Sequence, residues 1–149
     1  AREFGINKTM KMAGLLVFNS DIHSLGLKNT EGLYLTTSWD WNLNDQSRAF
    51  GKKFFAKTKP MPTDVQAANY PATTNYPKAL EAAGPTAMYV FYGKGMMRPV
   101  GRYAHDMYLM QVKGQKDSKE AWDYYRVVAT LPAEQVWTTK AESKCALWK

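Results

Sequence analysis

The residues best suited to chemistry are Trp39, Asp40 and Trp41, which lie between two predicted elements. Residues 33–37 are rich in β-forming side chains, and the Asn-Asp pair at 44–45 can accept the free amide hydrogens that open a helix. An acid between two indoles therefore follows the end of a strand, where open α/β folds place their ligand crevices. The indoles either pack beneath a loop, line a pocket or form a partner surface.

Covalent chemistry has weaker support. Asp40 could form an acid/base pair with Asp45 or Glu31, but the separation that such carboxylates need is spatial and not sequential. His105 and Asp106 are adjacent, and adjacent residues on a strand point to opposite faces. The sequence contains no GxSxG nucleophile elbow and no GxxxxGK[ST] or GxGxxG phosphate loop. We therefore expect no catalytic residues and no enzyme activity.

Metal and disulfide chemistry would need more ligands than the chain offers. Cys145 is the one cysteine, and His23 and His105 are the two histidines. A metal cluster needs more thiols or imidazoles, and an internal disulfide needs a second cysteine. We expect no metal and no other cofactor, histidines that are structural or exposed, and a Cys145 that is free or pairs outside this chain.

The composition is that of one globular domain or of a piece of a larger protein. The 149 residues are 45% hydrophobic and 13% aromatic, with a net charge of +7. No apolar run is long enough to span a bilayer, and no signal peptide is apparent. The lysines are scattered among acids, which is more typical of a solvated surface than of a nucleic-acid groove. We expect no nucleic-acid partner, and keep a small basic adaptor that binds nucleic acid or another acidic partner as the alternative function.

The first 32 residues predict three short elements. Residues 1–6 are typical of a helix tail that ends near Gly5. Residues 10–18 form a nearly continuous apolar run, the pattern of a strand buried on both faces in a parallel sheet. A polar turn at 19–21 and a short helical turn at 22–27 follow.

Two helices are predicted after the Trp-Asp-Trp stretch. The first covers 45–57 and has one apolar stripe. The second begins at 63–64 and ends before Gly84, and it contains Pro71 and Pro77. An interior proline costs about 3 kcal/mol, so we expect this helix to be kinked or split.

Two strands are predicted near the end of the chain. Residues 107–113 alternate in polarity, and residues 124–130 are rich in β-formers. A polar loop separates the two stretches, which favours a hairpin or two neighbouring strands. The pattern over 85–100 predicts no definite element.

A non-catalytic aromatic pocket is therefore the leading interpretation. Trp39 and Trp41, with Tyr70, could hold a flat or aliphatic small molecule. Side chains that could orient it are those of Asn42, Gln66 and Asn69. Tyr70 and Gln66 could equally be ordinary surface residues of an amphipathic helix.

Long stretches of the sequence resemble one family. Residues 1–70, and later GRYAHDMYLMQVK, WDYYRVVAT and ESKC, resemble the C-terminal portion of a periplasmic solute-binding protein of the branched-chain amino-acid-binding type, the receptor of an ABC importer. The resemblance implies an α/β fold with two hinge-linked lobes, each an open, mostly parallel sheet flanked by helices. It also implies a periplasmic location, capture of a small-molecule solute between the lobes, and delivery to the importer's permease.

The resemblance further implies how the chain is divided. Residues 1–32 would end the second lobe, 33–44 would form a hinge crossing and cleft segment, 45–106 would supply helices and the C-terminal part of the first lobe, and 107–149 would hold the last hinge strand and the C-terminal strands of the second lobe. The family's N-terminal portion has no match here. We therefore expect a C-terminal fragment that self-associates through exposed strand edges.

Carried over by position, the family's ligand contacts fall on a small set of residues. They are Leu15, Leu16, Trp39, Asp40, Trp41, Gln66 and Tyr70. Family receptors for α-amino acids place an acid near the position of Leu15 and Leu16 to meet the ammonium group. Two leucines instead favour a carboxylate, an aromatic acid or an amide as the solute.

Overall fold

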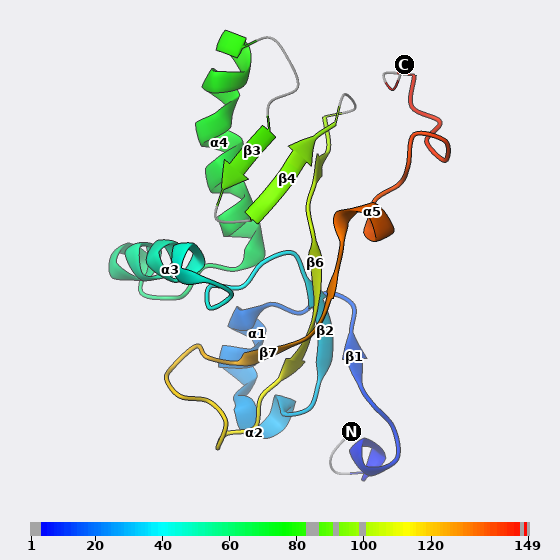
Figure 1. Ribbon diagram of the computed structural model, residues 1–149. Coiled ribbons are helices and arrows are strands. Elements are labelled where there is room, and N and C mark those ends of the chain that lie inside the picture. Colours follow the sequence, from blue (N-terminus) through cyan, green and yellow to red (C-terminus); the bar gives the residue numbers. More distant parts are fainter. Residues whose placement is uncertain (1–3, 83–86, 91–92, 99–100, 147, 149) are drawn as a thin grey trace.

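The computed structural model describes residues 4–82, 87–90, 93–98, 101–146 and 148 of the chain. Figure 1 shows α4 (Asp64–Ala82) grouped with β3 and β4 at one end of the molecule. The other end holds α1 (Asn19–Leu25) and α2 (Leu27–Thr30), beside the strands of a second sheet. The chain has the mixed α/β class expected from its sequence.

The larger sheet has the strand order β1-β2-β6-β7. Its strands are β1 (Ala13–Gly14), β2 (Tyr34–Thr37), β6 (Met107–Val112) and β7 (Tyr125–Leu131). Among the described strands, β1 and β2 form the one parallel pair, and the other pairs are antiparallel. The predicted strands at 107–113 and 124–130 are confirmed, and they are hydrogen-bonded neighbours across the polar loop.

The smaller sheet has the strand order β3-β4-β5 and is antiparallel. It consists of β3 (Ala87–Val90), β4 (Gly93–Met97) and β5 (Tyr103–Ala104). A Cβ atom added at Gly95 would collide with the ring of Tyr103, so this close approach requires glycine. The glycines that obscured the β pattern over 85–100 are therefore part of the sheet.

Helix α3 (Asp45–Thr58) begins where the sequence predicts. The Asn44 side chain accepts a hydrogen bond of 2.8 Å from the Ser47 amide, so it supplies the expected cap. Helix α4 is confirmed, but the split expected at Pro71 and Pro77 is wrong, because one helix runs unbroken through both positions. Each proline removes one backbone donor, and this loss does not interrupt the 19-residue helix.

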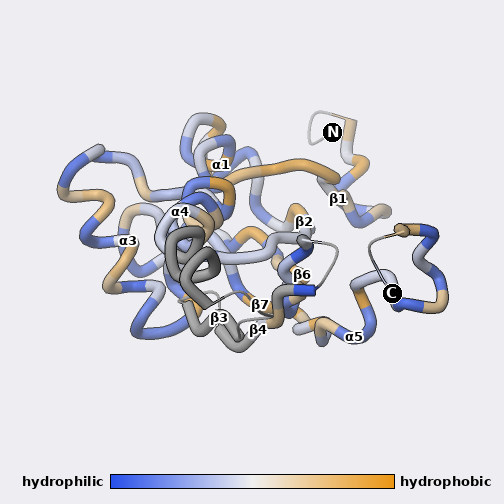
Figure 2. Tube along the Cα trace, turned by 90° about the horizontal axis from the view of Figure 1, so that it is seen from above, coloured by the Kyte–Doolittle hydropathy of each residue, from blue (hydrophilic) through white to orange (hydrophobic). Residues whose placement is uncertain are grey.

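The strand expected over 10–18 is wrong apart from the two residues of β1. The chain turns directly after β1, where a Cβ atom on Gly14 would collide with the Val17 side chain. Leu15 and Leu16 lie on this turn and are 97% and 78% exposed. Figure 2 shows the path from β1 to α1 as a continuous hydrophobic stretch.

Two further expectations near the start of the chain are wrong. The polar turn at 19–21 is the first turn of α1, because the Asp21 carboxylate accepts a 2.8 Å hydrogen bond from the Phe18 amide and so closes the helix start. The helix tail at 1–6 falls partly on residues 1–3, which lie outside the described residues. Gly5 has the expected left-handed φ of 66°, but it precedes the short 3₁₀ helix η1 (Ile6–Lys8) instead of ending a helix.

The hydrophobic core lies between the larger sheet and its neighbouring helices. Its buried residues are Ile22, Leu35, Trp39, Trp41, Met61, Ala67, Met110, Val112, Trp122 and Tyr124. The last helix is α5 (Ala133–Val136), a single short turn. In the described part of the chain, no helix combines the length and the apolar character needed to cross a membrane.

Candidate functional site

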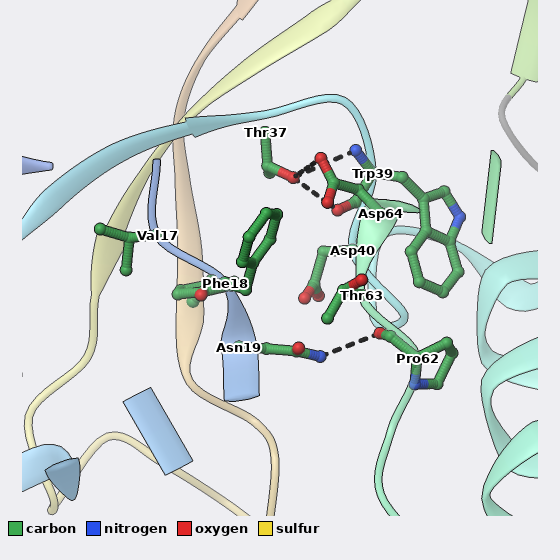
Figure 3. A pocket seen from close by; sticks show the side chains of 10 residues that line it. Val17, Phe18, Asn19, Thr37, Trp39, Asp40, Pro62, Thr63 and Asp64 are labelled. Carbon is green, nitrogen blue, oxygen red and sulfur yellow. Dashed lines mark hydrogen bonds between the residues drawn. The ribbon is translucent and has the colours of Figure 1, made fainter. Parts of the chain in front are cut away.

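A small polar pocket lies where the start of α1, the end of β2, the start of α4 and β7 meet (Figure 3). We call it the Asn19 pocket. It is lined by Val17, Phe18, Asn19, Thr37, Trp39, Asp40, Pro62, Thr63, Asp64 and Tyr125. Its cavity volume of about 10 Å³ is room for one water-sized group.

Two buried polar atoms at this pocket have no hydrogen-bond partner among the described residues. The Asn19 side chain is 5% exposed, and its Nδ2 donates a 2.9 Å hydrogen bond to the Pro62 carbonyl oxygen. Its Oδ1 is unpaired, as is the hydroxyl of Tyr125. Leaving a buried polar atom unpaired costs about 1–3 kcal/mol. Such atoms are therefore strong candidates to contact a bound group.

Asp64 ties the first turn of α4 to the end of β2. Its Oδ2 accepts a 3.1 Å hydrogen bond from the Ser38 hydroxyl and lies 3.2 Å from the Thr37 hydroxyl. The Thr37 hydroxyl also lies 2.8 Å from the Trp39 carbonyl oxygen. The strand end, the tryptophan loop and α4 therefore share one hydrogen-bonded corner of the pocket (Figure 3).

Asp40 is the most perturbed acid of the pocket. Burial raises the pKa of its carboxyl from 3.8 to about 6, against the 2.9 Å hydrogen bond that the Asn42 amide donates to Oδ1. Burial also raises the pKa of the Tyr125 hydroxyl, and the nearby carboxylates of Asp40, Asp21 and Asp64 raise it further. The pocket is therefore acidic and rich in hydrogen-bond acceptors, with one phenol that stays protonated.

The tryptophan loop is clamped to the loop between β6 and β7. Asp123 accepts hydrogen bonds from Lys113 Nζ at 2.6 Å, from the Lys119 amide at 3.0 Å and from Asn42 Nδ2 at 3.2 Å. Burial alone would raise the pKa of Asp123, but these donors hold it below its ordinary value. The clamp helps to fix the loop that places Asp40 in the pocket wall.

Both predicted tryptophans are buried, at 2% and 1% exposure. Trp39 lines the pocket and donates a 3.0 Å hydrogen bond from Nε1 to the Ser47 hydroxyl. Trp41 lies in the core, where its Nε1 donates a 2.8 Å hydrogen bond to the Trp122 carbonyl oxygen. The structure therefore brings Trp39 and Asp40 together at the pocket, whereas Trp41 supports the loop from behind.

The other four predicted ligand contacts do not line the Asn19 pocket. Leu15 and Leu16 precede its wall residues Val17 and Phe18 but point to solvent. Gln66 is exposed, and its Oε1 accepts a 2.7 Å hydrogen bond from the Thr63 amide at the start of α4. Tyr70 is 50% exposed, and its ring centroid lies 5.3 Å from that of Phe50.

Sequence reasoning missed Asn19, Thr37, Asp64 and Tyr125 as pocket residues. One signal could have found Asn19, because it is the first polar residue after the apolar run at 10–18, just as Trp39 to Trp41 follow the run at 33–37. No local pattern marks Tyr125, because its place in the pocket depends on the pairing of β7 with β6.

The two histidines have structural partners. The His23 ring stacks on Trp122 with centroids 3.9 Å apart, and its Nδ1 lies 2.6 Å from the Tyr124 hydroxyl. His105 is buried, and its Nδ1 donates a 2.7 Å hydrogen bond to the Asp106 carbonyl oxygen. Within the described ranges, no three His, Cys, Asp or Glu side chains are arranged to hold a metal ion.

Comparisons with known proteins agree with this α/β architecture. A family model described as "Periplasmic binding protein" matches residues 1–119. The crystal structure of a periplasmic binding protein from Burkholderia mallei is 52% identical, with a TM-score of 0.88 over 100% of this chain and 43% of that chain. No curated protein sequence matches the chain.

A second crystal structure is of a branched-chain amino acid ABC transporter periplasmic ligand-binding protein from Burkholderia xenovorans LB400. It is 40% identical, with a TM-score of 0.89 over 100% of this chain and 44% of that chain. The chain thus spans less than half the length of either Burkholderia protein. A leucine-, isoleucine-, valine-, threonine- and alanine-binding protein from Brucella ovis, at 17% identity and a TM-score of 0.71 over 91% of this chain and 40% of that chain, shares the fold. The chain belongs to the periplasmic binding protein family.

Proposed function

We propose that the chain is part of an ABC-transporter substrate-binding protein and that it contributes the Asn19 pocket to the solute site. The observation that carries this proposal is the family match, together with the relative of 40% identity that is described as an ABC transporter periplasmic ligand-binding protein. In this function a small organic solute is captured in the periplasm between two lobes and passed to a membrane permease. No covalent chemistry is involved.

The Asn19 pocket would receive the polar end of that solute. The unpaired Oδ1 of Asn19 can accept a hydrogen bond, and the unpaired hydroxyl of Tyr125 can donate one. A group that both donates and accepts satisfies the two atoms together. Because the cavity has room for only one water-sized group, only the polar end of the solute can enter it.

Among the three solute classes favoured by the sequence, these groups suit an amide best. An amide N–H can donate to Asn19 Oδ1 while its carbonyl oxygen accepts from Tyr125. A carboxylate would meet the buried Asp40 and the partly buried Asp64 at the same pocket, and like charges in a poorly solvated site repel each other. We therefore favour an amide-bearing solute over a carboxylate or an aromatic acid.

The remaining predicted residues keep supporting roles in this proposal. Trp39 would supply an apolar wall, and Asp40 would set the charge at the pocket. Residues 33–44 would act as a hinge crossing between the lobes, as the family resemblance implies. Leu15, Leu16, Gln66 and Tyr70 would reach the solute only from the rim of a closed cleft.

Calorimetric titration of the chain tests the proposal. The panel is a set of primary amides, aromatic acids, aliphatic carboxylates and branched-chain amino acids. We expect saturable binding of an amide, and about tenfold weaker binding after Tyr125→Phe, because the substitution removes one hydrogen bond to the solute. Below pH 6 the protonation of Asp40 removes one negative charge, so any weak binding of a carboxylate should strengthen.

Tyr124→Phe is the matched control. The Tyr124 hydroxyl lies 2.6 Å from His23 Nδ1 and does not line the pocket, so its removal should leave solute affinity unchanged. Binding of no member of the panel would contradict the proposed function. Binding that both variants weaken equally would contradict the assignment of the Asn19 pocket.

A further inference from the structure

Lys113 directly follows β6 and is not among the residues that line the Asn19 pocket. Its side chain is 16% exposed, and its Nζ lies 2.6 Å from Oδ1 of Asp123, whose side chain is 2% exposed. Both charges of this ion pair are therefore largely removed from water. Loss of one member would leave the other as an uncompensated buried charge, so each depends on its partner.

Asn42 connects this ion pair to the pocket. Its side-chain Nδ2 donates a 3.2 Å hydrogen bond to Asp123 Oδ1, and its backbone amide donates a 2.9 Å hydrogen bond to Asp40 Oδ1. Arg48 of α3 holds Asn42 in this position, because its guanidinium donates to the Asn42 side-chain oxygen at 3.1 Å and to the Asn42 carbonyl oxygen at 3.2 Å. The carboxylates of Asp40 and Asp123 are thus bridged by one residue.

Asp40 is surrounded by groups that disfavour its negative charge. Asp64 of α4 and Tyr125 of β7 line the same pocket (Figure 3). Beyond the larger effect of burial, the charge of Asp123 raises the pKa of Asp40, whereas the charge of Lys113 lowers it. Lys113 therefore offsets the repulsion that Asp123 would otherwise exert on the acid in the pocket wall.

We propose that Lys113 is a positioning residue that sets the charge of the Asn19 pocket and thereby the class of solute that it accepts. Its ion pair with Asp123 lets Asp40 remain ionised in the pocket wall. The ionised Asp40 repels a solute carboxylate and tolerates an amide. The part of this inference that concerns the solute rests on the proposed function, whereas the charge of Asp40 can be measured in the solute-free chain.

A purely structural role for Lys113 leads to a different expectation. If the ion pair only held the loop between β6 and β7, its removal would lower the free energy of unfolding and leave the titration of Asp40 unchanged. If Lys113 sets the charge of the pocket, its removal shifts that titration. The titration midpoint of Asp40 is therefore the quantity that separates the two roles.

Nuclear magnetic resonance of the Asp40 carboxyl carbon during a pH titration measures this midpoint without solute. We expect Lys113→Met to raise it from about 6 by at least about 0.5 pH unit, because Asp123 then repels Asp40 without compensation. Lys113→Arg keeps the cation and should keep the wild-type midpoint. Lys116→Met is the matched control, because Lys116 is exposed in the same loop, and it should also leave the midpoint unchanged.

A double variant keeps the test decisive if Lys113→Met alone fails to fold. Lys113→Met with Asp123→Asn removes both charges of the ion pair, so no buried charge loses its partner. The repulsion from Asp123 is then also absent, and the midpoint of Asp40 should lie at or below the wild-type value. A midpoint that is raised in the double variant would contradict an action of Lys113 through Asp123.

Calorimetry at pH 7 with a primary amide and the corresponding carboxylate gives the solute readout. In Lys113→Met the affinity for the carboxylate should rise about two- to threefold relative to the amide, because a larger fraction of Asp40 is then protonated. An unchanged Asp40 midpoint, or a raised midpoint with an unchanged affinity ratio, would overturn the proposal. A raised midpoint in a chain that binds no solute would contradict the proposed function and still support the assignment of the pocket charge to Lys113.

Discussion

Two segments with large apolar side chains each follow a strand of the larger sheet, and they differ completely in burial. Trp39 and Trp41 are almost fully buried, and each indole N–H donates a hydrogen bond. Leu15 and Leu16 lie on a turn of similar hydrophobic character and are 97% and 78% exposed. The tryptophans have partners within this chain, in α3 and in the loop between β6 and β7. Local sequence therefore sets the tendency to be buried, and the presence of distant segments decides whether burial occurs.

Among substitutions in these two segments, removal of a buried indole should lower the free energy of unfolding the most. Trp41→Ala leaves a cavity against Gly51, whose added Cβ atom would lie 2.9 Å from the Trp41 Cβ, and removes the donor to the Trp122 carbonyl oxygen. We expect the free energy of unfolding in urea to fall by about 3–5 kcal/mol. A loss below about 1 kcal/mol would show that the loop is not held by this side chain.

Asp40, the buried acid between the two tryptophans, should have the next largest effect on the free energy of unfolding. The carboxyl of Asp40 has a pKa of about 6 in the folded chain against 3.8 ordinarily, so the folded state binds the proton more tightly. The free energy of unfolding should therefore fall as the pH rises from 3.8 to 6, on the order of 3 kcal/mol in total. Asp40→Asn should remove this dependence and stabilise the chain above pH 6.

Thermal unfolding at a series of pH values checks this prediction. Asp117→Asn is the matched control, because Asp117 is exposed, and it should keep the wild-type pH profile. Asp123 affects the pH dependence of stability in the direction opposite to Asp40. Its pKa is lowered, so its contribution to stability is present above pH 3.8 and is lost as the pH falls below that value. An unchanged profile for Asp40→Asn would contradict the burial of an ionisable Asp40.

A smaller change in the free energy of unfolding is expected at Tyr125, the pocket residue whose hydroxyl has no partner among the described residues. Tyr125→Phe removes a buried hydroxyl that has no partner among the described residues, so the free energy of unfolding should rise by about 1 kcal/mol. Tyr124→Phe removes a hydroxyl joined to His23, and stability should fall by a similar amount. Chemical denaturation of both variants should give shifts of opposite sign. Shifts of the same sign would show that the Tyr125 hydroxyl is satisfied.

The smallest effect is expected at the exposed leucines. Leu15→Ala should change the free energy of unfolding of the isolated chain by less than about 0.5 kcal/mol, because the side chain makes few contacts to lose. Urea denaturation alongside Trp41→Ala gives the direct contrast. A loss as large as that of the tryptophan variant would mean that Leu15 is buried in solution.

Much of the fold follows from local sequence. The strand at 34–37, the Asn44 cap, helix α3 and the alternating strand at 107–112 each depend on residues within a few positions of one another. The prediction of a strand over residues 10–18 was wrong because a strand buried on both faces needs neighbouring strands on both sides, and β1 has one described neighbour. Pairing partners lie far away in sequence, and no local pattern encodes them.

The candidate site could be predicted only in part, for the same reason. Trp39 and Asp40 were found because they follow directly on a strand. Asp64 and Tyr125 reach the same pocket from α4 and β7, which tertiary packing alone brings together. The unpaired atoms of Asn19 and Tyr125 are properties of that packing.

The most direct test of the central claim is nuclear magnetic resonance of the side-chain amides during titration with the tightest-binding primary amide. Asn19 lines the pocket, whereas Asn29 lies on α2 and donates to the Leu25 carbonyl oxygen. If the Asn19 pocket holds the polar end of the solute, the Asn19 side-chain signals should shift in a saturable manner while those of Asn29 stay in place. Saturable binding with no shift at Asn19 would contradict the account.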